Sequence, residues 1–115
     1  MPNTCTADDN RRTNTIRQLN DAFRATFQGG RVLITRGVAD RPDLDDILEQ
    51  VRTFDRFTAR DDPHCEHDFG AIKIAGGSVF WKLDYYDVDL QCGSPDPADP
   101  AVTTRVLTIM LAEEY

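Results

Sequence analysis

The sequence lacks the long hydrophobic run that a membrane span requires. No apolar stretch among its 115 residues approaches the roughly 20 consecutive residues that cross a bilayer. The first residues, Met1-Pro2-Asn3, do not have the pattern of a secretory signal peptide. We therefore expect a cytoplasmic protein that does not associate with a membrane.

Cysteine is scarce, and its spacing is unlike that of common metal or redox motifs. Cys5, Cys65 and Cys92 are odd in number, and no two of them form a Cys-x-x-Cys pair. Disulfides persist mainly in oxidising compartments, and structural zinc usually needs four ligands in two separated pairs. We expect a reduced chain with free thiols and no cofactor.

The signatures of common enzyme classes are also missing. The sequence has no nucleophile elbow, P-loop, His-Glu-x-x-His zinc motif or dinucleotide-binding glycine pattern. His64 and His67, with Cys65 between them, supply the residue types of a metal site at a spacing that is untypical of one. They are the metal candidates, and the alternative is a polar loop that enters a strand. The motifs therefore favour a protein that is not an enzyme.

Positive charge is in deficit, and the excess negative charge lies in one part of the sequence. Residues 61–99 hold nine acidic and two basic residues, a net charge of −7 that equals the charge of the whole chain. Because binding to nucleic-acid phosphates needs a basic patch, direct nucleic-acid binding is not expected. An acidic region suits a basic partner surface. The alternative is a solvated edge that keeps a small protein in solution.

The clearest structural signal is Gly76-Gly77, which lies between the apolar runs Ala71–Ala75 and Val79–Leu83. A glycine pair between strand-forming runs predicts a two-residue hairpin, since a type I′ turn needs positive φ at both central residues. This register places Ile74 opposite Val79. Alternation along the two strands then predicts one core face, which carries Ile72, Ile74, Val79, Trp81 and Leu83.

The opposite face of this hairpin is polar and supplies a candidate site. The predicted register carries His67 opposite Tyr86, with Asp84 and Lys82 along the same side. A histidine beside a carboxylate has the right chemistry for proton transfer. The catalytic candidates are therefore His67, Asp84, Lys82 and Tyr86. The alternative is that His67 caps the strand while Lys82 and Asp84 form a pair on a half-exposed sheet.

Three helices are predicted from apolar stripes at helical spacing and from their end signals, over about residues 9–27, 42–54 and 100–115. The last of these opens at Asp99-Pro100, with an aspartate cap and a first-turn proline. The arginines of the first helix, Arg24 among them, are assigned to its solvated side. A short strand is expected at Arg31–Val38.

The predicted fold class is α+β, with the element order α-β-α-β-β-α. About three mainly antiparallel strands are expected, with the helices packed on one face. Residues 1–9 are expected to form a loose N-terminal arm, and residues 10–115 a single domain.

Three segments resemble a known family: EHDFG from Glu66, VFWKLDYYD from Val79 and GSPDPADPAVTTRVLTIMLAEEY from Gly93. The family is a small bacterial one, catalogued only as a domain of unknown function, and its members occur among accessory genes of plasmids and other mobile elements. The resemblance covers about residues 14–115. It implies no catalytic residues, because no activity is established for the family. By association, the resemblance implies a biological setting, in which the protein acts on host defence or plasmid maintenance.

The first function hypothesis is a non-enzymatic module that presents an acidic, aromatic-containing surface to a basic protein. Its most concrete form is a nucleic-acid-mimicking inhibitor of a host defence or DNA-processing protein. One alternative is a small hydrolase-type or metal-dependent enzyme that uses His67, Asp84 and Lys82, and another is a homodimeric structural module. The partner-binding candidates are Asp84, Tyr86, Asp87, Asp89 and Asp96.

Overall fold

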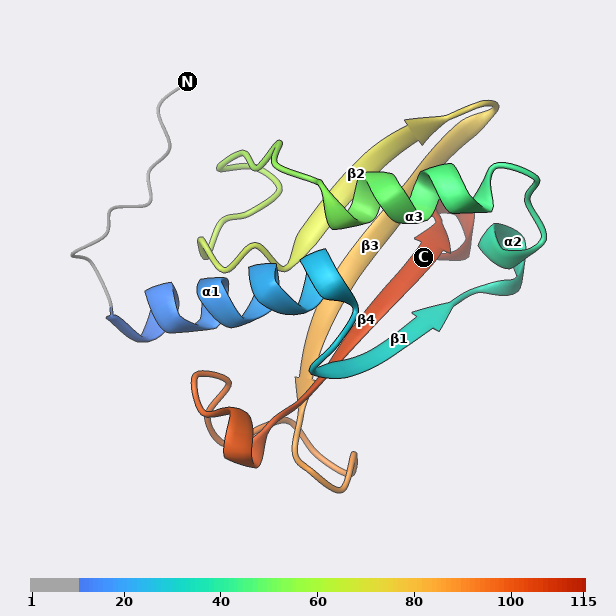
Figure 1. The fold of residues 1–115 in the computed structure, drawn as a ribbon. Helices are drawn as coiled ribbons and strands as arrows, with labels where there is room; N and C mark the ends of the chain where they lie inside the picture. The colour runs from blue at the N-terminus through green and yellow to red at the C-terminus, as the bar shows by residue number, and fades with distance from the viewer. Residues whose placement is uncertain (1–10) are drawn as a thin grey trace.

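The structure, a computed structural model, describes residues 11–115 (Figure 1). Its helices are α1 (Arg11–Thr26), α2 (Arg36–Ala39) and α3 (Leu44–Arg52), and its strands are β1 (Gly30–Ile34), β2 (Phe69–Ile74), β3 (Gly77–Tyr86) and β4 (Thr104–Leu111). Two short 3-10 helices, η1 (Pro100–Val102) and η2 (Ala112–Glu114), flank β4. The arm predicted at residues 1–9 lies outside the described residues.

The four strands form one mixed sheet in the order β1-β4-β3-β2. β1 runs parallel to β4, whereas β3 is antiparallel to both β4 and β2. Figure 1 shows α1 and α3 over one face of this sheet. The α+β class is confirmed. The predicted number of strands and the predicted order of elements are wrong, and the main reason lies at the last element.

The segment after Asp99 forms a strand, where the sequence predicts a helix over residues 100–115. The cap forms as expected, because the Asp99 carboxylate accepts a hydrogen bond from the Ala101 N–H at 2.9 Å. It starts only the three-residue η1. β4 follows, lies between β1 and β3, and is buried on both faces. A strand buried on both faces shows no alternation, so its apolar residues also fit a helical stripe.

The hairpin forms in a register that differs from the predicted one by two residues. Ile72, rather than Ile74, lies opposite Val79. Gly76 has the expected positive φ of +84°, whereas Gly77 is already the first residue of β3 and lies outside the left-handed region. The predicted pairing is therefore wrong. Because the shift is an even number of residues, the side chains of β2 and β3 still lie on their predicted faces.

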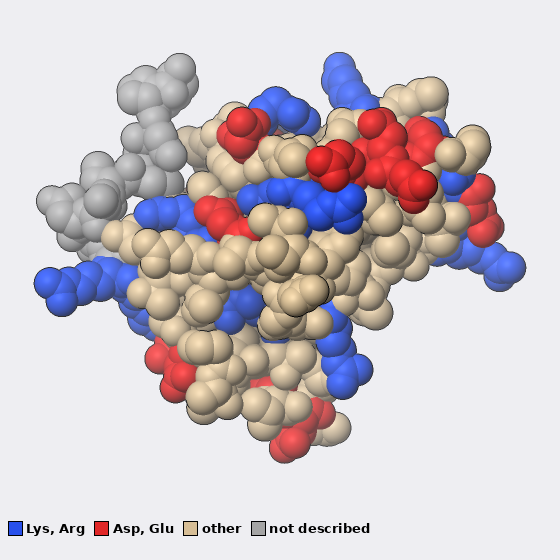
Figure 2. All heavy atoms as spheres, in the orientation of Figure 1, with Lys and Arg blue, Asp and Glu red and all other residues tan. Residues whose placement is uncertain are grey.

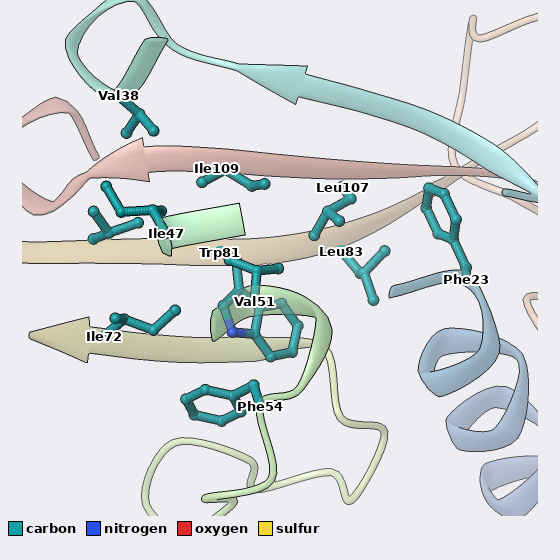
Figure 3. Close-up of a cluster of buried hydrophobic side chains, with 11 residues drawn as sticks. Phe23, Val38, Ile47, Val51, Phe54, Ile72, Trp81, Leu83, Leu107 and Ile109 are labelled. Atoms are coloured by element: carbon teal, nitrogen blue, oxygen red, sulfur yellow. The ribbon is translucent and has the colours of Figure 1, made fainter. Parts of the chain in front are cut away.

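The core lies between the helices and the sheet (Figure 3). At its centre the fully buried Trp81 meets the ring of Phe54 edge-on, with 5.4 Å between centroids. The indole lies over Gly70 of β2, so closely that a Cβ built on Gly70 would be 2.3 Å from Trp81 Nε1. The predicted core face of the hairpin is confirmed. The other core residues are Phe23, Val38, Ile47, Val51, Ile72, Val79, Leu83, Leu107 and Ile109.

Two further findings bear on the expected cellular setting. Across residues 11–115, no helix has both the length and the apolar character needed to cross a membrane. Cys65 is disulfide-bonded, so the expectation of free thiols is wrong for this residue. Cys92 is free and exposed, and Cys5 lies outside the described residues. The cytoplasmic location stays a prediction.

Candidate functional site

The face of the sheet that α1 and α3 leave uncovered, here called the open face, carries three of the predicted site residues. Leu83 points into the core, so its neighbours Lys82 and Asp84 point to the open face. Tyr86 follows on the same side by alternation. The structure therefore brings Lys82, Asp84 and Tyr86 together on one surface.

A groove with a volume of about 380 Å³ runs over the open face. Within it, Lys82 Nζ donates a hydrogen bond to Asp84 Oδ2 at 2.7 Å. This bond raises the pKa of Lys82 above its ordinary value. Arg31 also lines the groove and has no ion pair with any residue from 11 to 115. The full lining is Arg31, Leu33, Lys82, Asp84, Tyr86, Leu90, Val106 and Thr108.

Aromatic side chains continue the open face beyond Lys82. Phe69 of β2, which pairs with Lys82, has its ring centroid 5.2 Å from that of Phe80 in β3. Tyr115 meets the ring of Phe80 edge-on at 5.6 Å. Because Tyr115 is 75% exposed, this aromatic cluster remains accessible to solvent.

The loop after β3 holds three of the expected partner-binding carboxylates. Asp87 Oδ1 accepts a hydrogen bond from the Gln91 N–H at 2.9 Å, and Asp96 pairs with Arg12 of α1 at 3.1 Å. These two carboxylates stabilise the loop and attach it to α1. The exposed Asp89 carboxylate has no hydrogen bond or ion pair within the described part of the chain. The loop therefore offers less free negative charge than its sequence suggests.

His67 lies on the opposite side of the sheet from the groove. Its ring stacks on Phe57 with 3.6 Å between centroids, and Phe57 in turn packs edge-on against the core residue Trp81. His67 Nδ1 lies 2.9 Å from Asp21 Oδ1, so α1 rather than β3 supplies its carboxylate partner. The predicted position of His67 opposite Tyr86 does not occur.

The backbone before β2 explains the displacement of His67. β2 begins only at Phe69, and His67 has a φ of +55°, in the left-handed region that turns the chain away from the strand direction. The buried Asp62 carboxylate holds this bend, since Asp62 Oδ1 accepts the N–H groups of Glu66 and His67, each at 3.0 Å. Strand alternation therefore stops before His67.

A second group of polar side chains is buried between α1 and the sheet. Fully buried Asn20 donates to the Tyr85 hydroxyl at 2.8 Å and accepts from Arg105 Nε at 2.7 Å. The Tyr85 hydroxyl donates to Glu66 Oε1 at 2.7 Å. Burial and this bond raise the pKa of the Tyr85 phenol, and burial lowers the pKa of Arg105. This Asn20 network (Asn20, Glu66, Tyr85 and Arg105) joins α1, the segment before β2, β3 and β4.

Sequence reasoning missed the buried polar residues of α1 because it assigned the arginines, Arg24 among them, to the solvated side and did not consider Asn20. Arg24 is buried and donates to the carbonyl oxygens of Val51 and Phe54, at 2.9 and 3.0 Å. Asn20 lies four residues after buried Ile16, on the apolar stripe itself. A polar residue at a stripe position was the signal that could have revealed these contacts.

Asp21→Asn is expected to reduce stability in a pH-dependent way. Burial alone would raise the pKa of Asp21, but its bonds and charge interactions with His67 and Arg24 hold that pKa below its ordinary value. A carboxyl with a lowered pKa stabilises the fold above its ordinary pKa of about 3.9 and loses this contribution as pH falls. The urea midpoint of the variant should lie below that of the wild type at about pH 7 and approach it below about pH 3.

Asp89→Asn is the control for this pH dependence, because the Asp89 side chain makes none of these contacts. Its urea midpoint should follow that of the wild type at every pH. A gap between Asp21→Asn and the wild type that stays constant from neutral to acid pH would contradict the assigned role of Asp21.

The metal candidates do not converge. Among the described residues, no group of three or more His, Cys, Asp or Glu side chains is placed to hold a metal ion. His64 is exposed, whereas His67 contacts Asp21 and Phe57. Within residues 11–115, no hydrogen bond links His67 to a hydroxyl or thiol side chain that could act as a nucleophile.

Comparison with known proteins identifies a family for the chain but no individual relative. The comparison with curated proteins gives no match, and neither does the comparison with solved structures. One family model, described as a protein of unknown function (DUF3768), matches residues 12–114. The resemblance inferred from the sequence motifs is thereby confirmed, while the mobile-element setting stays a prediction. Because the match spans nearly all of its 115 residues, the chain belongs to the DUF3768 family.

Proposed function

We propose that this protein is a protein-binding module whose recognition surface is the open face of the sheet. The observation that carries the proposal is the exposure of large apolar side chains along the groove. Leu33 is 53% exposed, and Tyr86 and Leu90 are each 37% exposed. Neighbouring exposed apolar side chains, bordered by polar ones, are typical of protein interaction sites.

The charged groups of the groove suit binding better than catalysis. A general acid or base works best with a pKa near the operating pH. The bond to Asp84 shifts the pKa of Lys82 upward, away from neutral pH, and the two side chains remain partly open to solvent. His67, the remaining catalytic candidate, lies on the other side of the sheet. These observations support a binding role over the hydrolase-type alternative.

The acidic surface expected from the sequence has weaker support than the open face. Asp87 and Asp96 are engaged within the protein. On the helix side, Figure 2 shows acidic side chains gathered over the start of α3, where Asp45 and Asp46 occupy the first helical turn. Carboxylates in a first turn stabilise the helix by interacting with the positive end of its dipole, which gives them a structural role. Binding of a basic partner, and inhibition by nucleic-acid mimicry, stay predictions.

Photo-crosslinking from the groove tests the proposal while the partner is still unidentified. p-Benzoylphenylalanine placed at Tyr86 is expected to give a discrete adduct in irradiated host cells, since this position lines the groove. The same photoreactive group placed at Gln18, an exposed position of α1, is the control on the helix side. Mass spectrometry of the adduct then identifies the bound protein.

Two matched substitutions decide whether the groove itself is responsible. Leu33→Asp should abolish the adduct, because it replaces the most exposed apolar side chain of the groove with a charged one. Val88→Asp changes a similarly exposed apolar residue outside the groove and should leave the adduct in place. Adducts that persist in Leu33→Asp contradict the proposal, as does labelling that is the same from both photoreactive positions. An adduct formed with a second copy of the chain would instead support the alternative that the protein is a homodimeric structural module.

A further inference from the structure

β1 is an edge of the sheet whose outward backbone groups are open to pairing. It pairs only with β4, and Figure 1 shows no element of the described chain beyond it. The Thr35 N–H donates to the Ile109 carbonyl oxygen at 3.0 Å, so the N–H of Leu33, two residues earlier, also faces β4. The N–H and C=O groups of Val32 and Ile34 therefore face away from the sheet.

β1 has little of the protection that edge strands usually carry. Leu33 and Ile34 are consecutive, point to opposite faces and are 53% and 36% exposed. Edge strands commonly resist pairing through lysine or other charges, proline or bulges. The other edge strand, β2, carries the exposed Lys73, whereas the only charge in β1 is Arg31 near its start. An exposed apolar edge of this kind suits the addition of a strand.

Arg31 indicates the charge of a strand that would fit. It is the groove cation without an ion pair among residues 11–115, whereas Lys82 is compensated by Asp84. An acidic side chain on an added strand would lie beside Arg31 and supply the missing counter-charge. A second copy of this chain would instead bring a second Arg31 and a second net charge of −7, which disfavours pairing of β1 with β1.

We propose that β1 accepts an added strand from a partner protein, an extended segment with an acidic residue beside Arg31 and an apolar residue beside Leu33. Because side chains on one face of a strand recur at every second position, one residue separates the acidic residue from the apolar one. Backbone bonds to β1 supply affinity, and the two side chains supply specificity. The inference rests on the proposed function, since it takes the groove as a protein-binding surface.

Selection of phage-displayed random peptides on the immobilised chain tests this chemistry. The enriched peptides are expected to share an acidic and an apolar residue separated by one position. A synthetic representative, followed by fluorescence anisotropy, should bind Arg31→Glu at least about tenfold more weakly than the wild type, because attraction becomes repulsion. Arg60→Glu reverses an exposed arginine outside the groove and should bind the peptide as the wild type does.

Ile34→Pro distinguishes strand addition from simple contact with the open face. Proline removes the outward N–H at this position and spares the ladder to β4, so the peptide should again bind at least about tenfold more weakly. Ile34→Val keeps the N–H and should bind normally. In the wild-type chain, hydrogen exchange at the Ile34 amide should slow when the peptide binds. That measurement decides the question if the proline variant does not fold.

Each outcome of these experiments counts for or against the added strand. Failure to enrich acidic peptides overturns it, as does equal binding by Arg31→Glu and Arg60→Glu. Equal binding by folded Ile34→Pro and Ile34→Val, or unchanged exchange at the Ile34 amide, overturns it as well. If crosslinking from Tyr86 still captures a partner in those cases, the protein-binding function stands and only strand addition fails.

Discussion

Gly70→Ala is expected to lower the free energy of unfolding by about 3 kcal/mol. An alanine Cβ at this position would lie 2.3 Å from Nε1 and 2.6 Å from Cε2 of Trp81, well inside van der Waals contact. The indole cannot move aside easily, because it is fully buried and packs edge-on against Phe54. Urea denaturation followed by the fluorescence of Trp81, the single tryptophan of the chain, measures the loss.

Gly77→Ala is the matched control in the same hairpin. Nothing lies within 4 Å of a Cβ at this position, and its φ is outside the left-handed region. The substitution should change the free energy of unfolding by less than about 0.5 kcal/mol. Equal losses from the two alanine variants would show that the contact between Gly70 and Trp81 does not limit the packing of the core.

Asn20→Ala is expected to destabilise the fold by a similar amount, about 3 kcal/mol. The substitution leaves Arg105 Nε without its acceptor and removes the donor to the Tyr85 hydroxyl, both at a buried site. Each buried polar group without a partner costs about 1–3 kcal/mol, and a charged one more. Urea denaturation measures the effect. Gln18→Ala, at an exposed position of the same helix, should be nearly neutral.

A double-mutant cycle shows whether the Asn20 network acts as a unit. If it does, Tyr85→Phe should reduce stability much less in the Asn20→Ala background than in the wild type, because the bond between these side chains is already lost. Losses that add up fully would contradict a coupled network and would assign the effect of Asn20→Ala to its bonds with Arg105 and with the Glu66 carbonyl oxygen.

The face assignment of the hairpin could be predicted, whereas its register could not. Side chains alternate along a strand, so the spacing of Val79, Trp81 and Leu83 defines a buried face wherever the turn lies. The turn depends on which residue takes positive φ. Gly76 and Gly77 are equally able to do so, and sequence alone does not choose between them.

The sequence pattern of the last strand predicts a helix. The segment forms a strand because its tertiary surroundings, rather than its own periodicity, determine its structure. Val106, Leu107 and Met110 occupy helical spacing, but all three are buried in β4, on both of its faces. The position of β4 between β3 and β1 depends on pairing with a strand that lies 75 residues earlier in the sequence. A continuous apolar run with β-branched residues was the only local indication of a strand.

The candidate site was predictable where it lies on one strand and unpredictable where it depends on tertiary contacts. Lys82, Asp84 and Tyr86 share a face through the alternation of β3 alone. Arg31 joins them only through the pairing of β1 with β4, which no local pattern in the sequence indicates. His67 lies outside the site because Asp62, buried in the preceding loop, holds a left-handed bend at the position of His67.

The place of β4 in the sheet sets the order in which the chain can fold as it is made. Gly30 pairs with Arg105, so the strands that meet here are 75 residues apart in sequence. At about 5–20 residues per second, β1 emerges from the ribosome roughly 4 to 15 s before β4. Until β4 is made, the apolar faces of α1 and α3 lack the central strand of the sheet on which they pack. The growing chain therefore exposes apolar surface until β4 is made, and any fragment that stops before β4 leaves β1 without a neighbour.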